Sequence, residues 1–220
     1  VEKKAKTGGD KESAKILELL LQYKDALIKG LSARTVQLDE NEKKLVSDLF
    51  LLTSKPVLYV CNVDEKSAVN GNSHVERLKK AVEAENAEVL VIAAATEAEI
   101  AELETYEERQ VFLSDMGLDE PGVNKLIKKA YKLLDLETYF TTGKDETRAW
   151  TIHKGMKAPE AAGVIHTDFQ RGFIRAEVIK YSDYITLGSE AACREAGKIG
   201  VQGKEYVVQD GDILHFRFNV

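Results

Sequence analysis

A short polar loop follows an unbroken apolar stretch of this chain. Residues Val57 to Cys61 contain no charged or amide side chain, and Asn62 and Glu65 come soon after them. An unbroken run of apolar, β-branched and aromatic residues predicts a strand that is buried on both faces, as in a parallel sheet. Ligands of open α/β sheets bind at the carboxyl ends of the strands, so this loop is the first candidate for a binding site.

The spacing of Asn62 and Glu65 is that of loops that bind a purine base. An aspartate at the fourth position accepts hydrogen bonds from guanine N1–H and N2–H2, whereas adenine offers its N6–H2 donors and N1 as an acceptor. Asp64 lies one residue too early to take that position. Glu65 therefore predicts weaker selectivity for guanine, because a site whose polar groups stay unpaired discriminates strongly. A loop without a ligand is the alternative on spacing alone.

Several motifs of nucleotide and metal chemistry are missing from the sequence. No Gly-x-x-x-x-Gly-Lys-Ser/Thr loop occurs, and the nearest segment, 203–205, lacks the upstream glycine and the hydroxyl. We therefore expect no catalytic residue for phosphoryl transfer in this chain. The four histidines and two cysteines do not have metal-ligand spacing, so no metal site is predicted.

The last third of the chain contains candidates for an RNA-binding surface. Two aromatic residues, Phe169 and Phe173, lie among cations, a combination found where proteins contact RNA. Ordinary surface charge beside core aromatics is the alternative. The candidate cations are Arg171, Arg175, Lys180, Lys198 and Lys204.

The charge distribution limits the classes of partner. Residues 1–36 carry eight basic and five acidic groups, residues 37–136 twelve and twenty, and residues 137–220 eleven and twelve. This balance predicts no DNA specificity, and an RNA partner must be recognised by shape and a few residues. Cys61 and Cys193 lie in unrelated elements, and no apolar run reaches the ~18 residues of a membrane span, so we expect a reduced, cytoplasmic setting without a membrane.

The first half of the chain reads as helices around two strands. Asp10 is expected to cap a helix over 11–29, whose Ile16, Leu20, Tyr23 and Leu27 form a coiled-coil seam. With a helix end over 1–6, this suggests a helical hairpin, and a core helix of a bundle is the alternative. Further predictions are a helix from Asp39 or Asn41 to 55, strands 57–61 and 89–95, and helices 73–82, 97–120 and 121–134.

From about residue 137 the pattern changes to short strands. We expect strands over 148–153, 173–179, 205–208 and 213–218, short helices over 158–164 and 190–196, and a turn at 210–212. Such a segment predicts a small α+β domain of the ubiquitin-like β-grasp type.

Several segments resemble the Obg-like ATPase (YchF) family of P-loop NTPases. They are Asn-Val-Asp-Glu at 62–65, Tyr-Phe-Thr-Thr-Gly at 139–143, Arg-Ala-Trp-Thr-Ile at 148–152, Ala-Pro-Glu-Ala-Ala-Gly at 158–163, Ile-His-Thr-Asp-Phe at 165–169, Arg-Gly-Phe-Ile-Arg-Ala at 171–176 and Asp-Gly-Asp-Ile at 210–213. The resemblance covers the whole chain.

The resemblance implies the fold class and three domains. Residues 1–36 would be part of a helical coiled-coil insertion, 37–135 the carboxyl-terminal half of a P-loop NTPase-type parallel sheet domain, and 136–220 a β-grasp TGS domain linked to RNA and ribosome binding. The chain would be a portion of the family's full length, since the phosphate loop is missing.

The resemblance also implies a function for the loops. The family prefers ATP, so Asn62, Val63 and Glu65 would contact the base, joined by Ala94 and Ala95, and Mg²⁺ would be bound by the missing amino-terminal part. We expect an ATP-hydrolysing protein that engages ribosomes or RNA and binds GTP more weakly, while this chain alone is inactive. The alternatives are a non-catalytic RNA- or protein-binding module and a GTP-binding protein of the Obg group.

Overall fold

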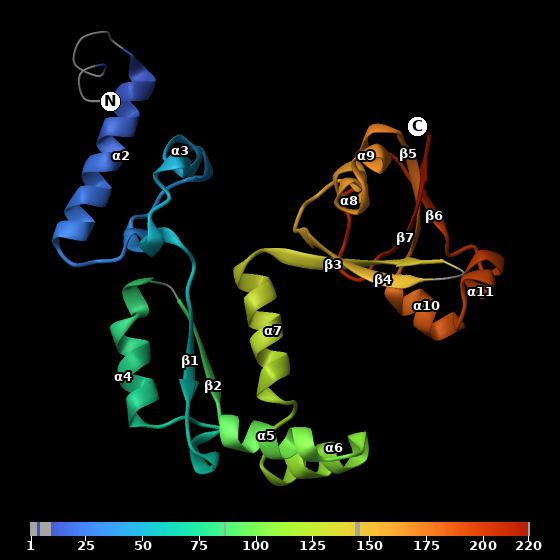
Figure 1. The fold of residues 1–220 in the computed structure, drawn as a ribbon, viewed down its shortest axis with the longest axis horizontal. Coiled ribbons are helices and arrows are strands. Elements are labelled where there is room, and N and C mark those ends of the chain that lie inside the picture. Colours follow the sequence, from blue (N-terminus) through green and yellow to red (C-terminus); the bar gives the residue numbers. More distant parts are fainter. Residues whose placement is uncertain (1–3, 5–9, 86, 144–145, 220) are drawn as a thin grey trace. The chain divides into compact units, whose positions relative to one another are not determined.

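A computed structural model describes residue 4 and residues 10–85, 87–143 and 146–219. The chain divides into two compact units, Val1–Leu133 and Leu134–Val220, which are described separately (Figure 1). The expected helix end over 1–6 lies outside the described residues apart from residue 4.

The amino-terminal unit contains two strands and six longer helices among its described residues. In chain order these are α2 (Lys11–Ile28), α3 (Glu40–Leu45), β1 (Leu58–Asn62), α4 (Ser73–Ala81), β2 (Glu88–Ile92), α5 (Ala94–Glu102), α6 (Tyr106–Asp115) and α7 (Gly122–Leu133).

The predicted β-α-β order is confirmed by a parallel pair of strands. β1 and β2 pair in register from Leu58↔Glu88 to Asn62↔Ile92, with α4 between them in the chain and α7 packed against both strands. The prediction that β1 is buried on both faces is wrong, because Val60 of this strand is 43% exposed. Among the described residues β1 has a strand on one side only, so one edge and part of one face have no covering element.

Helix α2 begins where the sequence predicts, with the Asp10 side chain accepting a hydrogen bond from the Glu12 N–H. Its buried stripe differs from the predicted seam. Leu19 and Ala26 are buried, whereas Leu27 is 43% exposed. Segment 33–35 and α3 pack against α2, and these contacts decide which face is buried.

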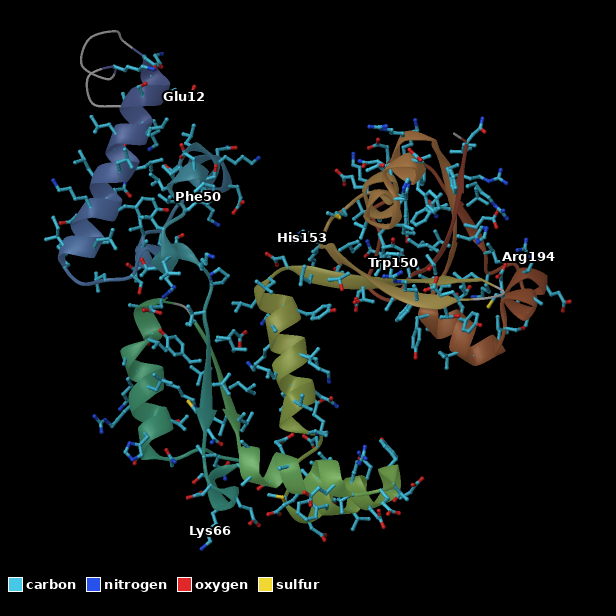
Figure 2. The ribbon with its side chains drawn as sticks, viewed as in Figure 1. Glu12, Phe50, Lys66, Trp150, His153 and Arg194 are labelled. Atoms are coloured by element: carbon cyan, nitrogen blue, oxygen red, sulfur yellow. The ribbon has the colours of Figure 1, made fainter. Side chains whose placement is uncertain are left out.

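The predicted helix from 39 to 55 is much shorter in the structure. Asp39 caps it in a capping box with Glu42, but α3 ends at Leu45 and two single 3-10 turns follow. Phe50 adopts a left-handed backbone conformation with φ 46°, which an α-helix cannot contain. Phe50 and Leu52, which a continuous helix would place on its apolar side, are 85% and 78% exposed. Figure 2 labels Phe50 in this segment.

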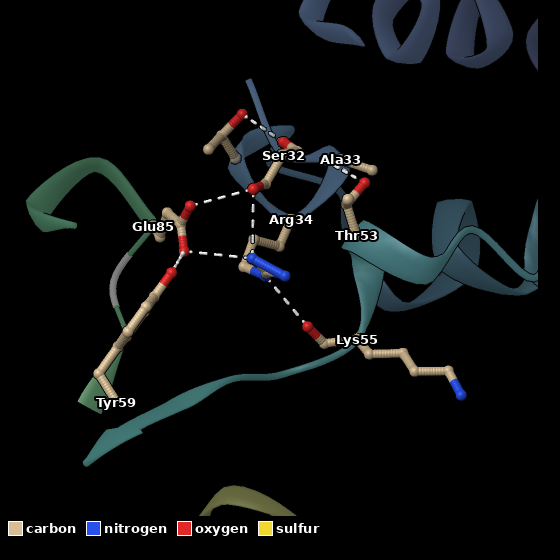
Figure 3. Close-up of polar contacts among 8 residues, drawn as sticks. Ser32, Ala33, Arg34, Thr53, Lys55, Tyr59 and Glu85 are labelled. Carbon is tan, nitrogen blue, oxygen red and sulfur yellow. Dashed lines mark hydrogen bonds and ion pairs between the residues drawn. The ribbon is translucent and has the colours of Figure 1, made fainter. Parts of the chain in front are cut away.

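A polar network connects the segment after α2 to the sheet (Figure 3). The Glu85 carboxylate accepts hydrogen bonds from the Tyr59 hydroxyl at 2.9 Å and the Ser32 hydroxyl at 3.0 Å, and pairs with the Arg34 guanidinium at 3.2 Å. Arg34 also donates to the Lys55 carbonyl at 3.0 Å. These contacts hold three segments together that are far apart in the sequence.

The predicted helical region 97–120 consists of two helices, α5 and α6, and Gly117 follows them with φ 70°. Helix α7 confirms the prediction over 121–134. Its amino terminus is capped from another helix, because the Glu97 carboxylate of α5 accepts the Gly122 N–H at 2.7 Å.

The carboxyl-terminal unit contains β3 (Leu136–Thr142), β4 (Thr147–His153), α8 (Ala158–Ile165), α9 (Thr167–Arg171), β5 (Phe173–Ile179), α10 (Tyr181–Leu187), α11 (Glu190–Glu195), β6 (Gly200–Gln202) and β7 (Ile213–Phe218). The five strands have the order β4-β3-β7-β5-β6, and β3 runs parallel to β7 while the other pairs are antiparallel. This is the predicted β-grasp arrangement.

Two strands of this unit differ from the sequence prediction. β3 was not predicted, and it pairs along its whole length with β4 from Leu136↔His153 to Thr142↔Thr147. The strand predicted over 205–208 is wrong, since this segment forms a single bridge, Lys157↔Val207, and β6 lies earlier.

The main core of this unit lies between the sheet and α8. Tyr139 and Ile152 pack with three alanines of α8, and the buried Tyr139 hydroxyl donates to the Ala161 carbonyl at 2.9 Å. Burial raises the pKa of Tyr139 far above its usual value. A smaller cluster of Ile179, Ile213 and Cys193 of α11 packs against Tyr184 and Leu187 of α10.

Candidate functional site

The register of β1 and β2 brings their two following loops together. Asn62 and Ile92 are paired partners, and the Val63 N–H donates to the Ile92 carbonyl at 2.8 Å. The Asn62 side-chain oxygen accepts the Ala94 N–H at 3.0 Å. Three of the predicted base-contacting residues, Asn62, Val63 and Ala94, therefore lie together at the carboxyl ends of β1 and β2, which is called the edge below. Hydrogen bonds join the two loops there.

The two acids of the loop have different roles. The Asp64 carboxylate accepts the Ser67 N–H at 3.0 Å and so caps the turn 65–67. Hydrogen bonding to Ser67 lowers the pKa of Asp64 below its usual value, which keeps it an anion engaged in the turn. Glu65 is the first residue of this turn and its side chain is exposed, as a group that receives a ligand must be.

Ala94 and Ala95 form the first turn of a helix instead of the end of a strand, so the predicted strand over 89–95 is too long. β2 ends at Ile92 and α5 begins at Ala94. The N-cap residue Ala93 has no side chain that could cap α5, and the Asn62 oxygen accepts the N–H of the first helical residue, Ala94, in its place. The N–H groups of a first helical turn have no partner inside the helix, so the Ala95 N–H is a donor at this edge.

The edge therefore combines one acceptor and one donor. The exposed Glu65 carboxylate accepts hydrogen bonds, and the Ala95 N–H donates one.

The five cations predicted to contact RNA are not equivalent. Arg175 lies 3.8 Å from the Glu177 carboxylate, and Lys198 pairs with Asp183 at 3.2 Å. In the part of the chain that the structure describes, Arg171 and Lys204 have no ion pair. These two are the available cations of the predicted surface.

Lys180 has a structural role. Its ammonium group pairs with Asp212 at 2.6 Å, and the Asp212 side chain is fully buried. The Tyr206 hydroxyl and the Gln209 N–H also donate to this carboxylate. Despite partial burial, hydrogen bonds to Asp212 and Tyr206 raise the pKa of Lys180, so it stays charged as the counter-ion of a buried group.

The two predicted aromatic residues also differ. Phe173 is 5% exposed and belongs to the core, whereas Phe169 is only partly buried and stacks on Phe218 with ring centroids 3.8 Å apart. Trp150 and Phe218 were not among the aromatic residues that the sequence predicted for this surface. Their alternation with polar residues in β4 and β7 is the signal that was available.

Among the described residues, no group of three or more His, Cys, Asp or Glu side chains is placed to hold a metal ion. None of the helices in the described part of the chain has the length and apolarity of a membrane span.

Comparisons with known proteins place this geometry in a family. The YchF-GTPase_C family model, described as "Protein of unknown function (DUF933)", matches residues 136–219. Ribosome-binding ATPase YchF of Bacillus subtilis is 53% identical over 213 residues, which cover 96% of this chain and 58% of that protein. The chain belongs to the YchF family.

Other YchF proteins agree with this assignment. Ribosome-binding ATPase YchF of Haemophilus ducreyi is 48% identical over 220 residues, covering 100% of this chain and 60% of that protein. The structure of the Schizosaccharomyces pombe YchF GTPase superimposes with a TM-score of 0.80 at 36% identity, covering 94% of this chain and 55% of that one. The chain thus spans somewhat more than half the length of these YchF relatives.

Proposed function

We propose that this chain supplies the base-binding edge of an ATP-binding, ATP-hydrolysing protein that works with ribosomes in the cytoplasm. The observation that carries the proposal is the hydrogen bond from the Ala94 N–H to the Asn62 side-chain oxygen at 3.0 Å. It joins the loop after β1, which contains the exposed Glu65, to the start of α5. The relatives from Bacillus subtilis and Haemophilus ducreyi are both named ribosome-binding ATPases.

The proposal assigns each residue of the edge a role toward the base. The Glu65 carboxylate accepts the N6 amino group of adenine, and the Ala95 N–H donates to the neighbouring ring nitrogen. Asn62 holds the loops, and Val63 lines the edge. When ATP is bound, it supplies the phosphoryl group that is hydrolysed. We assign the phosphate and Mg²⁺ contacts to residues outside this chain.

Comparing the affinities for ATP and GTP is the sharpest test of the proposal, because the Schizosaccharomyces pombe relative is named a GTPase. We expect ATP to shift the amide NMR signals of Val63, Glu65 and Ala95 in the 220-residue chain at millimolar concentration, and GTP to shift them less. The Glu65→Asp variant should reverse the order by several-fold in affinity, because the shorter acid suits the guanine donors.

One control variant completes this experiment. Asp64→Asn changes an acid that caps the turn and should leave the order of ATP and GTP unchanged. Equal shifts with ATP and GTP in the wild-type chain, or no change of order in Glu65→Asp, would contradict the assignment of Glu65.

A non-catalytic contact with ribosomal RNA is the second part of the proposal, and it rests on the β-grasp (TGS) unit. Arg171 and Lys204 are exposed cations without an ion pair among the described residues, so they are available to phosphates. Charge reversal at both positions should abolish co-sedimentation of the chain with ribosomes. Reversal of Lys24, an exposed cation of α2, is the matched control, and loss of binding in that variant would place the contact elsewhere.

A further inference from the structure

The carboxyl-terminal unit contains a cavity of about 470 Å³ with aromatic walls. Trp150 and Thr141 line it from β4 and β3, while Phe169 of α9 and Phe218 of β7 line it from the other elements. This volume is in the range of ~300–1,000 Å³ that is typical of small-molecule sites. Figure 2 labels Trp150 on the strand that contributes this wall.

The cavity results from a step in the sheet. Among the residues that the structure describes, β3 pairs with β7 only at Phe140↔Ile213, and β3 ends two residues later at Thr142. β7 continues to Phe218. The last residues of β7 therefore have β5 on one side but no strand on the other, and the aromatic residues line the cavity at this gap.

The aromatic rings are held in fixed orientations. The Trp150 indole N–H donates to the Thr141 hydroxyl at 2.9 Å. The rings of Phe169 and Phe218 are stacked at 3.8 Å with an angle of 26° between their planes. Flat faces that are oriented before binding favour stacking of a planar ligand, because little conformational freedom is lost.

Cations lie beside these rings. The Arg148 guanidinium lies 4.2 Å from the centre of the Trp150 ring, and Arg217 lines the cavity. Arg217 is oriented by two contacts with the Glu177 carboxylate, at 3.2 and 3.4 Å. Both guanidinium groups are paired with carboxylates, Arg148 with Glu146 at 3.9 Å and Arg217 with Glu177 at 3.2 Å, so the aromatic faces, on which unpaired bases stack, carry the recognition.

We propose that this cavity accepts an unpaired base of single-stranded RNA, stacked against Trp150 and the Phe169–Phe218 pair. This inference rests on the proposed RNA contact and adds the form of the RNA. Bases inside a duplex are stacked on each other and cannot enter the cavity. Eleven basic and twelve acidic groups over residues 137–220 leave little net attraction, so stacking in this cavity adds affinity that the phosphate contacts of Arg171 and Lys204 alone do not supply.

Trp150 is the only tryptophan of the sequence, so its fluorescence reports on this cavity. The 220-residue chain is titrated with a single-stranded oligo-adenylate RNA and with the same RNA annealed to its complement. Tryptophan fluorescence and the anisotropy of a dye on the RNA are followed together. We expect the single strand to quench Trp150 and the duplex to leave it unchanged.

Variants separate stacking from general effects on the fold. Phe169→Leu keeps an apolar side chain but removes the ring, and should weaken single-strand affinity about ten-fold. Phe169→Tyr should retain binding, and Phe218→Leu should weaken it like Phe169→Leu. Tyr181→Leu removes an exposed aromatic ring of α10 and is the matched control, which should bind like the wild type. Near-UV circular dichroism verifies that each variant is folded.

The outcomes distinguish this inference from the proposed function. If anisotropy rises without quenching, and Phe169→Leu binds normally, RNA is bound elsewhere and the cavity assignment is wrong while the RNA contact stands. If ribosomes co-sediment but no single strand binds, the cavity assignment is wrong and the ribosome contact is made by other means. Quenching by an apolar peptide but not by RNA would also overturn it and would indicate a protein partner.

Discussion

Glu85 shows how one carboxylate can hold several segments. It receives the hydroxyls of Tyr59 and Ser32 and the Arg34 guanidinium, and its side chain is 18% exposed. The hydrogen bond from Tyr59, with the contributions of Ser32 and Arg34, lowers the pKa of Glu85 below its ordinary value of 4.5. The ionised form is therefore favoured by folding.

This lowered pKa predicts an acid-sensitive contribution to stability. A group whose pKa is lower in the folded state stabilises the fold fully above its unfolded pKa and loses this effect as the pH falls through the folded value. The Glu85→Gln variant should thus melt at a lower temperature than the wild type at pH 7, with the difference shrinking below about pH 4. Melting curves of both proteins from pH 3 to 7, followed by far-UV circular dichroism, measure this.

Glu76 supplies the control for this pH series. It forms an exposed pair with Lys79 within one helix, and exposed pairs contribute little, so Glu76→Gln should melt like the wild type throughout. A difference between Glu85→Gln and wild type that stays constant from pH 7 to pH 3 would contradict the role of the ionised carboxylate.

For individual residues, the sequence indicated Asn62 and Glu65 as candidate binding residues, but it did not predict the network around Glu85. Asn62 and Glu65 share a local spacing behind an apolar run, and a spacing can be recognised in one sequence. Arg34 and Glu85 are 51 positions apart, and no local pattern relates them. The same holds for Lys180 and Asp212, so Lys180 was predicted as a surface cation although it neutralises a buried acid.

At the level of the elements, the contact between the residue after α9, Gly172, and the residue after β7, Asn219, requires glycine at position 172. A Cβ on Gly172 would lie 2.0 Å from the carbonyl oxygen of Asn219, whose N–H donates to the Gly172 carbonyl at 2.9 Å. Gly172→Ala therefore requires the backbone to move apart. We expect it to destabilise the carboxyl-terminal unit by about 2 kcal/mol, as overpacking does, measured by urea unfolding followed through Trp150 fluorescence.

Gly163 of α8 is the matched comparison. Its added Cβ would lie 2.6 Å from the end of the Gln170 side chain, which can turn away. Alanine also favours a helix interior over glycine by about 0.5–1 kcal/mol. Gly163→Ala should therefore be close to neutral, and equal destabilisation by both substitutions would contradict the argument from space at Gly172.

Periodicity predicted the amphipathic helices, and apolar runs predicted the two strands of the parallel pair, although β1 is only partly buried. Periodicity failed where short-range pattern and tertiary contacts disagree. The segment after α3 has the apolar spacing of a helix, yet the helix ends at Leu45 and Phe50 adopts φ 46°, which no α-helix contains. β3 carries threonines on both faces and escaped prediction, although its pairing with β4 and β7 makes it central to the sheet.

The molecule as a whole consists of two units with separate cores, so its unfolding should not be a single transition. The sheet of the amino-terminal unit has two strands among the described residues, a number that is marginal for stability. We expect far-UV circular dichroism, to which both units contribute, to begin its urea transition before Trp150 fluorescence, which reports on the second unit alone. Superimposable curves from the two probes would contradict this expectation.

The cap that Glu97 places on Gly122 has a mechanical consequence. Helix α5 begins at the edge where Asn62 holds Ala94, and its Glu97 holds the start of α7, whose last residue, Leu133, directly precedes the second unit. The twelve residues of α7 form a rod about 18 Å long that starts at this cap and packs against β1 and β2. The carboxyl ends of the two strands, the start of α5 and the start of α7 are thus braced against each other within the amino-terminal unit.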